Sequence, residues 1–242
     1  PRDSASSEPR GQPLLRLITK SSTADYFQEE KYFSLTLDVQ KKMPNFGFGN
    51  LIADWNFFLY VQYFGDGKAR DVTGYTLISE YFDVIVNNDP RFIKAYLALS
   101  TTNSLYGGYP DKTVANLDRV LQAINPKMSN YPFQIWVFKG VDEILFLGDM
   151  KGAKNSYEMA ADWAEQSIEP EGKLMVKRYK KTAAFLASNP DNTRAQVGAW
   201  LTIFYNTNDK MTKRNVINRI QALGVKVTLN PAGRLQIKFP EN

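Results

Sequence analysis

The sequence predicts an all-α fold, an α-α superhelix of helical hairpins that ends in a small β-hairpin. Three observations predict it. Ala153, Tyr157 and Ala160 follow the spacing A-x3-Y-x2-A. Two apolar helical runs end 36 positions apart, at Asp89-Pro90 and at Asn125-Pro126. The end of the chain alternates apolar and polar residues, as strands do. Helix pairs that stack in this way bury one another and leave a concave face.

We expect three parts: a flexible tether over residues 1–24, the helical-hairpin array over residues 25–209, and a cap of one helix and the β-hairpin over residues 210–242. The opening residues are polar and rich in proline and serine, as in a linker. The sequence begins with Pro1 rather than Met. These features favour an exported or membrane-tethered protein, and an arbitrary boundary in a flexible terminus is the alternative.

The first helices are the least regular. Residues 25–43 mix aromatic and charged residues, and their periodicity does not choose between helix and strand. Residues 51–64 read as a helix that is apolar on nearly every face, which is typical of a helix buried between neighbours. A membrane-surface helix, the alternative, would need a strongly charged face. The run has 14 residues, whereas a membrane span needs roughly 20, so no integral span is predicted.

The later elements follow from apolar spacing and from breaks at Gly, Pro and Asn. Asp111 is the expected N-cap of one returning helix. In the third pair, small residues and Tyr157 line the packing face of the returning helix, where two helices approach most closely. The predicted helices cover residues 75–87, 92–105, 114–124, 133–147, 153–164, 173–187, 194–205 and 213–223, and the predicted strands cover residues 225–229 and 235–239. A hairpin this small should lie against the last helices.

The chain contains no cysteine and no histidine. This composition excludes zinc sites of the Cys/His kind, disulfides, thiol nucleophiles, Ser-His-Asp triads and histidine ligation of haem. We therefore predict no catalytic residue, no metal site and no cofactor. Two groups of carboxylates are interpreted as solvated helix faces: Asp142 with Glu143, and Glu158 with Asp162 and Glu165.

Charge is unevenly distributed along the chain. Residues 1–167 carry a net charge of −3, and residues 168–242 carry a net charge of +8. This asymmetry indicates an anionic partner for the C-terminal third. One predicted helix places lysines at i, i+4, i+7 and i+8, and the candidate binding residues are accordingly Lys173, Lys177, Arg178, Lys180 and Lys181. A solvated outer face of a helix is the alternative interpretation.

Further basic residues, Lys210, Lys213, Arg214 and Arg219, extend the same character. This pattern disfavours a nucleic-acid partner, because nucleic-acid modules place exposed aromatic side chains among the cations. Tyr179 and Phe185 instead fall at core spacing.

Residues from about Trp55 to Ala164 resemble the tetratricopeptide repeat (TPR) superfamily. The segment from Gly148 to Ala160 follows the second half of that consensus closely, and Phe82 and Pro90 fit its second-helix aromatic and terminal proline. The segments 53–66 and 88–92 also resemble a bacterial group of divergent repeat proteins that includes cyanobacterial members. The resemblance implies the fold and an interaction role, and nothing catalytic.

The sequence therefore predicts a non-enzymatic protein–protein interaction or scaffold protein with a protein partner. The first alternative is an assembly factor recruited to an anionic membrane surface by the basic C-terminal third. A more distant alternative is a hydrolase without His or Cys, which would need a Ser-Lys or carboxylate-only mechanism.

Overall fold

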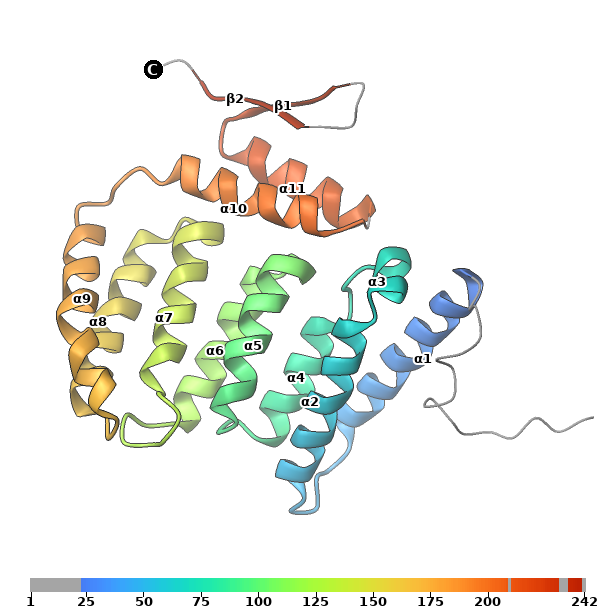
Figure 1. Cartoon of the computed structure of the whole chain (residues 1–242), viewed down its shortest axis with the longest axis horizontal. Helices are drawn as coiled ribbons and strands as arrows, with labels where there is room; N and C mark the ends of the chain where they lie inside the picture. The colour runs from blue at the N-terminus through green and yellow to red at the C-terminus, as the bar shows by residue number, and fades with distance from the viewer. Residues whose placement is uncertain (1–22, 209, 231–234, 241–242) are drawn as a thin grey trace, which may run out of the picture.

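The computed structural model describes residues 23–208, 210–230 and 235–240, and in these residues the chain is mainly helical with one two-stranded antiparallel sheet (Figure 1). The prediction of a helical chain with a C-terminal β-hairpin is confirmed. The α-helices are α1 (Thr23–Lys42), α2 (Gly49–Gly65), α3 (Gly67–Thr73), α4 (Ile78–Asn88), α5 (Ile93–Thr102), α6 (Pro110–Ala123), α7 (Phe133–Asp142), α8 (Met150–Gln166), α9 (Pro170–Leu186), α10 (Thr193–Asn206) and α11 (Lys210–Ala222). Two π-helical segments, η2 (Asn103–Gly107) and η3 (Glu143–Leu147), extend α5 and α7, and the strands are β1 (Lys226–Leu229) and β2 (Leu235–Lys238).

The longer helices lie side by side in an array that begins with α1 and α2 and ends with α9 (Figure 1). Helix α4 contacts α1, α2 and α6, helix α7 contacts α5, α6 and α8, and α8 packs on α9. Helices α10 and α11 lie across one edge of this array, where α10 contacts both η2 and η3. The expected tether, residues 1–24, lies outside the described residues except for Thr23 and Ala24, which belong to α1.

Two helical hairpins of the array are built alike, 40 positions apart. The carbonyl of Asn103 accepts hydrogen bonds from the N–H groups of Gly108 and Tyr109, and the carbonyl of Glu143 accepts them from Gly148 and Asp149. Both glycines have left-handed backbone angles, with φ of 72° at Gly108 and 66° at Gly148, which a side chain would disfavour. A π-helical turn closed by glycine therefore reverses the chain at the same point of each hairpin.

The A-x3-Y-x2-A pattern is packing, as the spacing predicts. Ala153 and Ala160 are fully buried on α8, and Tyr157 is buried between them. A Cβ atom at Gly140 of α7 would lie 3.0 Å from the Tyr157 ring. The tyrosine therefore fills the space that the glycine leaves, and the two helices pack closely.

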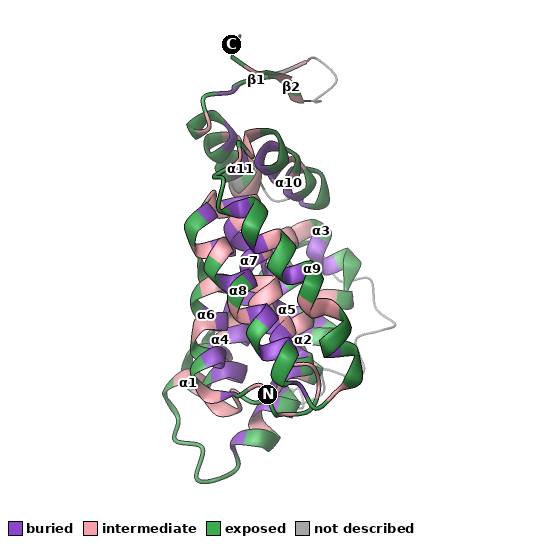
Figure 2. Cartoon of the chain, turned by 90° about the vertical axis from the view of Figure 1, so that its left-hand side faces the viewer, coloured by how far each residue is buried: buried purple, intermediate pink, exposed green. Residues whose placement is uncertain are grey.

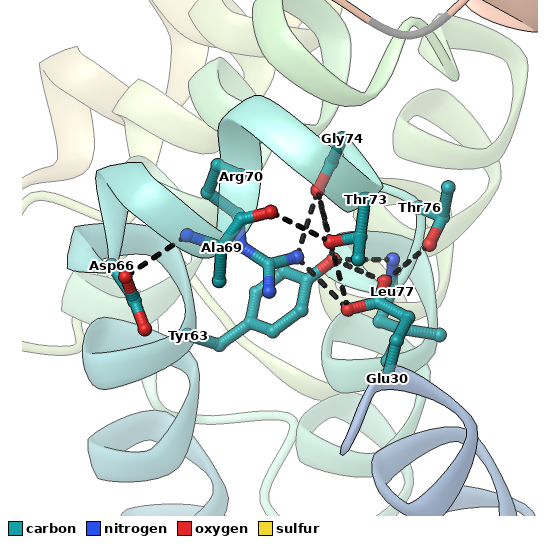
Figure 3. A network of polar contacts seen from close by, with 9 residues as sticks. All are labelled: Glu30, Tyr63, Asp66, Ala69, Arg70, Thr73, Gly74, Thr76 and Leu77. Carbon is teal, nitrogen blue, oxygen red and sulfur yellow. Dashed lines mark hydrogen bonds and ion pairs between the residues drawn. The ribbon is translucent and has the colours of Figure 1, made fainter. Parts of the chain in front are cut away.

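Residues 25–43, for which the sequence left helix and strand open, form most of α1. A partly buried ion pair attaches this helix to α3, which the sequence did not predict (Figure 3). Arg70 is 5% exposed, and its Nη1 lies 3.0 Å from Oε2 of Glu30 and 2.7 Å from the carbonyl oxygen of Gly74. The hydroxyls of Tyr63, Thr73 and Thr76 also bond Glu30, at 2.9, 3.2 and 2.5 Å. The Arg70 guanidinium lies 3.6 Å from the centre of the Tyr63 ring.

The expectation that residues 51–64 are buried on all sides is wrong. Ala53, Asn56 and Tyr60 of α2 are buried, but Trp55 and Phe58 are 55% and 48% exposed. Helix α2 lies at the end of the array, so no described helix covers its outer side (Figure 1). The expected N-cap Asp111 is also wrong, because α6 begins one residue earlier, at Pro110.

The C-terminal elements have a core of their own. Trp200 of α10 packs edge-on against Phe146 of η3, with ring centres 5.3 Å apart. Val216 and Ile220 of α11 and Val225 complete this second core, against which residues of both strands pack. As expected, the β-hairpin lies against the last helices.

Two glycine-to-alanine variants test the close packing. At Gly49 an added Cβ would lie 2.4 Å from the carbonyl oxygen of Asn88, a backbone atom that cannot move aside easily. We expect Gly49→Ala to lower the free energy of unfolding by about 1–3 kcal/mol. Gly198 in α10 is exposed with no atom near its Cβ position, so Gly198→Ala should raise it by about 0.5–1 kcal/mol. Urea denaturation measures both, and a Gly49→Ala variant as stable as Gly198→Ala would contradict the close packing at Gly49.

Candidate functional site

The five basic residues predicted as a binding face all lie on α9, and all five are exposed. Pro170 begins this helix at a position where proline is favoured. Tyr179, Ala183 and Leu186 are buried on the opposite side, with the Tyr179 ring 6.2 Å from the rings of Phe133 and Tyr157. Helix α9 forms the end of the array, and Figure 2 shows its exposed outer side facing the viewer.

The lysines at i, i+4 and i+7 are brought together, and the other two cations are not. Lys173, Lys177 and Lys180 line a surface hollow of about 640 Å³ together with Val176 and with Glu165 of α8. The Nζ atom of Lys180 lies 3.4 Å from Oε2 of Glu165. Arg178 directly follows Lys177, and Lys181 directly follows Lys180. Each is therefore turned by about 100° around the helix axis and lies on the adjoining strip of the helix surface. Among the described residues, the four cations other than Lys180 form no ion pair.

Two large apolar side chains stand among these cations. Leu174 is 79% exposed, and Phe185 is 62% exposed. The expectation that Phe185 belongs to the core is wrong. It follows Tyr179 by six positions, which places it about 240° further around the helix axis, away from the side that α8 covers. The face on α9, which we call the α9 basic face (Lys173, Lys177, Arg178, Lys180 and Lys181), therefore has an apolar component.

The basic residues beyond α9 are partly engaged in the fold. Arg219 pairs with Asp111 at 2.6 Å, and its guanidinium lies 5.5 Å from the centre of the Trp200 ring. Lys213 lies over the ring of Phe204. These contacts hold α11 against α10 and α6. The candidate surface for an anionic partner is therefore smaller than the net charge of residues 168–242 indicates.

The interpretation of Asp142 and Glu143 as a solvated face is wrong, because the two side chains are 6% and 4% exposed. Asp142 ends α7, and its Oδ2 lies 2.6 Å from Oγ of Ser104. Burial raises the pKa of Asp142 to about 7. The hydrogen bond from Ser104 lowers this pKa, and the nearby charge of Glu143 raises it. This carboxyl group is therefore about half protonated at neutral pH, where an ordinary aspartate is ionised.

Glu143 has a different environment from its neighbour. Burial raises its pKa too, but Ser156 bonds it at 2.6 Å and Lys139 lies 3.4 Å away, and both oppose that shift. Lys139 is also 2.7 Å from Asp118. Burial lowers the pKa of Lys139, and these two carboxylates more than offset it, so its pKa is raised overall. The ion pairs connect α6, α7 and the start of η3, so their role is structural.

A cavity of about 180 Å³ lies between the α5–η2 and α7–η3 segments, and Ser104 and Asp142 line it with mainly apolar neighbours. The pair has the residue types of a hydroxyl nucleophile and a carboxyl group. However, Ser104 is 1% exposed and lies 3.0 Å from Thr113 as well as next to Asp142. Both side chains are buried and bonded within the fold, so this geometry favours internal packing over the hydrolase alternative.

Glu158, Asp162 and Glu165 are exposed on α8, as predicted for a solvated face. Within residues 23–208, 210–230 and 235–240, no group of three or more acidic side chains could hold a metal ion. No described helix is long and apolar enough to cross a membrane.

The feature that the sequence analysis missed is a concentration of exposed apolar side chains at the α1–α2 end. Fifteen large apolar residues are exposed in the described part of the chain, and eleven of them lie between residues 27 and 61. We call this set the α1–α2 apolar surface: Phe27, Tyr32, Leu35, Val39, Met43, Phe46, Phe48, Leu51, Trp55, Phe58 and Val61. The sequence feature that could have predicted this surface is the apolar character of α2 on every face. Such a helix can be buried by a partner as well as by its own chain.

The array thus presents a basic face at its α9 end and an apolar surface at its α1–α2 end, with buried carboxylates between them that serve packing. A search of protein-family models, curated proteins and solved structures finds no match to this chain.

Proposed function

We propose that this chain is a non-enzymatic protein–protein interaction protein, a scaffold built from TPR-like helical hairpins. The observation that carries the proposal is the α1–α2 apolar surface. Isolated exposed apolar residues are normal on a soluble protein, but eleven large ones on two consecutive helices and the turn between them are typical of a surface that a partner covers.

The internal repeat supports the TPR-like part of the proposal. Two hairpins share a π-helical turn and a left-handed glycine at a spacing of 40 residues. The second helix of each hairpin, α6 or α8, carries a buried side that packs within the array. An array of such pairs has an extended surface for protein partners, and the charge and apolar character of its two ends select them.

The proposal is tested by co-purification with variants of α2. The double variant Trp55→Asp/Phe58→Asp should lose a protein that the native chain retains, because two exposed apolar contacts become charged. Gln62→Asp, an exposed polar position of the same helix, is the matched control and should retain it. The recovered protein is then purified and titrated directly by calorimetry, where apolar burial gives a negative heat-capacity change. If no recovered protein depends on Trp55 and Phe58, the proposal is wrong.

The α9 basic face supports a second candidate, recruitment to an anionic membrane surface. Cations near such a surface contribute about 1 kcal/mol each, and Leu174 and Phe185 would add apolar contact. Charge reversal of Lys173, Lys177, Lys180 and Lys181 should then reduce binding to phosphatidylserine vesicles by about tenfold or more at low salt. The control reverses four exposed lysines elsewhere, Lys68, Lys94, Lys127 and Lys151. Equal losses in both variants would show that net charge alone determines binding.

A further inference from the structure

We propose that this protein associates with itself head to tail, with the α9 basic face of one copy bound to the α1–α2 apolar surface of the next. The inference rests on the proposed protein-binding function and names a second copy of the chain as the partner. It depends on three features of the two ends: their position in the array, their apolar side chains and their opposite charge.

The two surfaces lie at opposite ends of the array. Helices α1 and α2 form one end and α9 forms the other, so a second copy could extend the row of helices in either direction (Figure 1). Helical arrays need terminal helices with polar outer faces to stay soluble as single molecules. The α1–α2 end does not meet this requirement in the described chain, since Trp55 and Phe58 are exposed there. The α9 end is polar, but the exposed side chains of Leu174 and Phe185 interrupt its basic face.

The charges of the two ends are complementary. Helices α1 and α2 carry five acidic and three basic residues, which gives a net charge of −2. Helix α9 carries five basic residues and one acidic residue, which gives a net charge of +4. On α1 and α2, Asp38 and Asp54 are exposed, each next in sequence to an exposed apolar residue. On α9, Lys177 and Lys181 are exposed on the same helix as Leu174 and Phe185.

Charge also decides the orientation. Two α9 faces placed together would bring two sets of five cations into contact, and two α1–α2 surfaces would bring together two net negative ends. Like charges across an interface are unfavourable, so both symmetric pairings are disfavoured. A head-to-tail contact uses different surfaces on each copy and leaves one end of each kind free, so it continues as a chain or closes as a ring.

The test uses sedimentation velocity on the full chain and on two end-blocked variants. The native chain should form species larger than a dimer as its concentration rises, and less so at high salt, because the charges are screened. Trp55→Asp/Phe58→Asp blocks one end, and Lys177→Glu/Lys181→Glu blocks the other. Each variant alone should be monomeric. Their mixture should give a 1:1 dimer and nothing larger, because one compatible pair of ends remains.

Other outcomes overturn the inference. A native chain that stays monomeric at all concentrations contradicts it directly. Self-association of the α9 variant alone would show that the α1–α2 surface pairs with itself. A mixture that stays monomeric while both variants keep the native circular dichroism and melting temperature would show that the two ends do not bind each other. If the native chain is monomeric but another protein binds it through Trp55 and Phe58, this inference is wrong and the proposed function stands.

Discussion

Replacing Glu30 with alanine should lower the free energy of unfolding by about 3–5 kcal/mol, the usual cost of leaving a buried charge without its partner. The Arg70 guanidinium is 5% exposed and would lose its carboxylate, as would the hydroxyls of Tyr63, Thr73 and Thr76. Since Glu30 comes from α1 and its partners from α2, α3 and the turn before α4, the loss should fall on the attachment of α1. Denaturation in urea measures the free energy, and amide hydrogen exchange shows whether α1 opens first.

Two variants control this experiment. Asp38→Ala removes an exposed carboxylate from the same helix and should change the free energy of unfolding by less than about 0.5 kcal/mol. Glu30→Gln keeps an acceptor for the hydroxyls but removes the charge, so it should fall between the native chain and Glu30→Ala. Equal stability of the Asp38 and Glu30 alanine variants would show that the ion pair does not hold α1.

Asp142→Asn should make the protein more stable than the native chain above pH 7 and equally stable near pH 4. The pKa of Asp142 rises from an ordinary value of 3.8 to about 7 in the folded chain. Below pH 4 this carboxyl group is protonated in both states and contributes no pH dependence. Between pH 4 and pH 7 the unfolded chain releases the proton while the folded chain keeps it, so the stability of the native protein falls as pH rises. The loss approaches about 4 kcal/mol as an upper limit, from about 1.36 kcal/mol per pKa unit.

Asparagine has nearly the shape of aspartic acid, and its carbonyl oxygen can still accept the Ser104 hydrogen bond. The difference in free energy of unfolding between the two proteins, measured from pH 4 to pH 8, isolates Asp142 from Glu143 and the other carboxylates. Asp162→Asn, at an exposed position of α8, should give no such difference. If the native chain has the higher free energy of unfolding at pH 8, Asp142 is ionised in the folded state and stabilises it.

Local rules predicted the helices from residue 51 onward and the β-hairpin, because apolar spacing and Pro or Gly breaks act within a few residues. They also identified the α8 packing face around Tyr157. They missed α3, because Gly65-Asp66-Gly67 reads as a turn. There Asp66 in fact caps the helix, its side chain accepting from the N–H of Ala69 at 3.1 Å.

What depends on distant neighbours was not predictable from the sequence. Asp142 is buried because Ser104 and Thr113, about 30 to 40 positions earlier, supply hydrogen-bonding groups around it. Trp55 is exposed because the array ends beside α2, which hydropathy cannot show. The α9 basic face could be predicted because it depends only on helical spacing. The exposure of Phe185 could not, because it depends on which side of α9 is covered by α8.

The position of α10 makes the molecule mechanically uneven along its length. A stack of helix pairs stretches by opening the joints between neighbouring pairs. Because α10 contacts both η2 and η3, pulling α5 away from α7 would also separate α10 from one of these two segments. Toward α3, by contrast, the residues after α10 contribute the exposed hydrogen bond from Asn208 to Asp71, and the Glu30–Arg70 pair lies within the first group of helices. Under tension the α1–α2 end should therefore yield first, while the segment beneath α10 keeps its length.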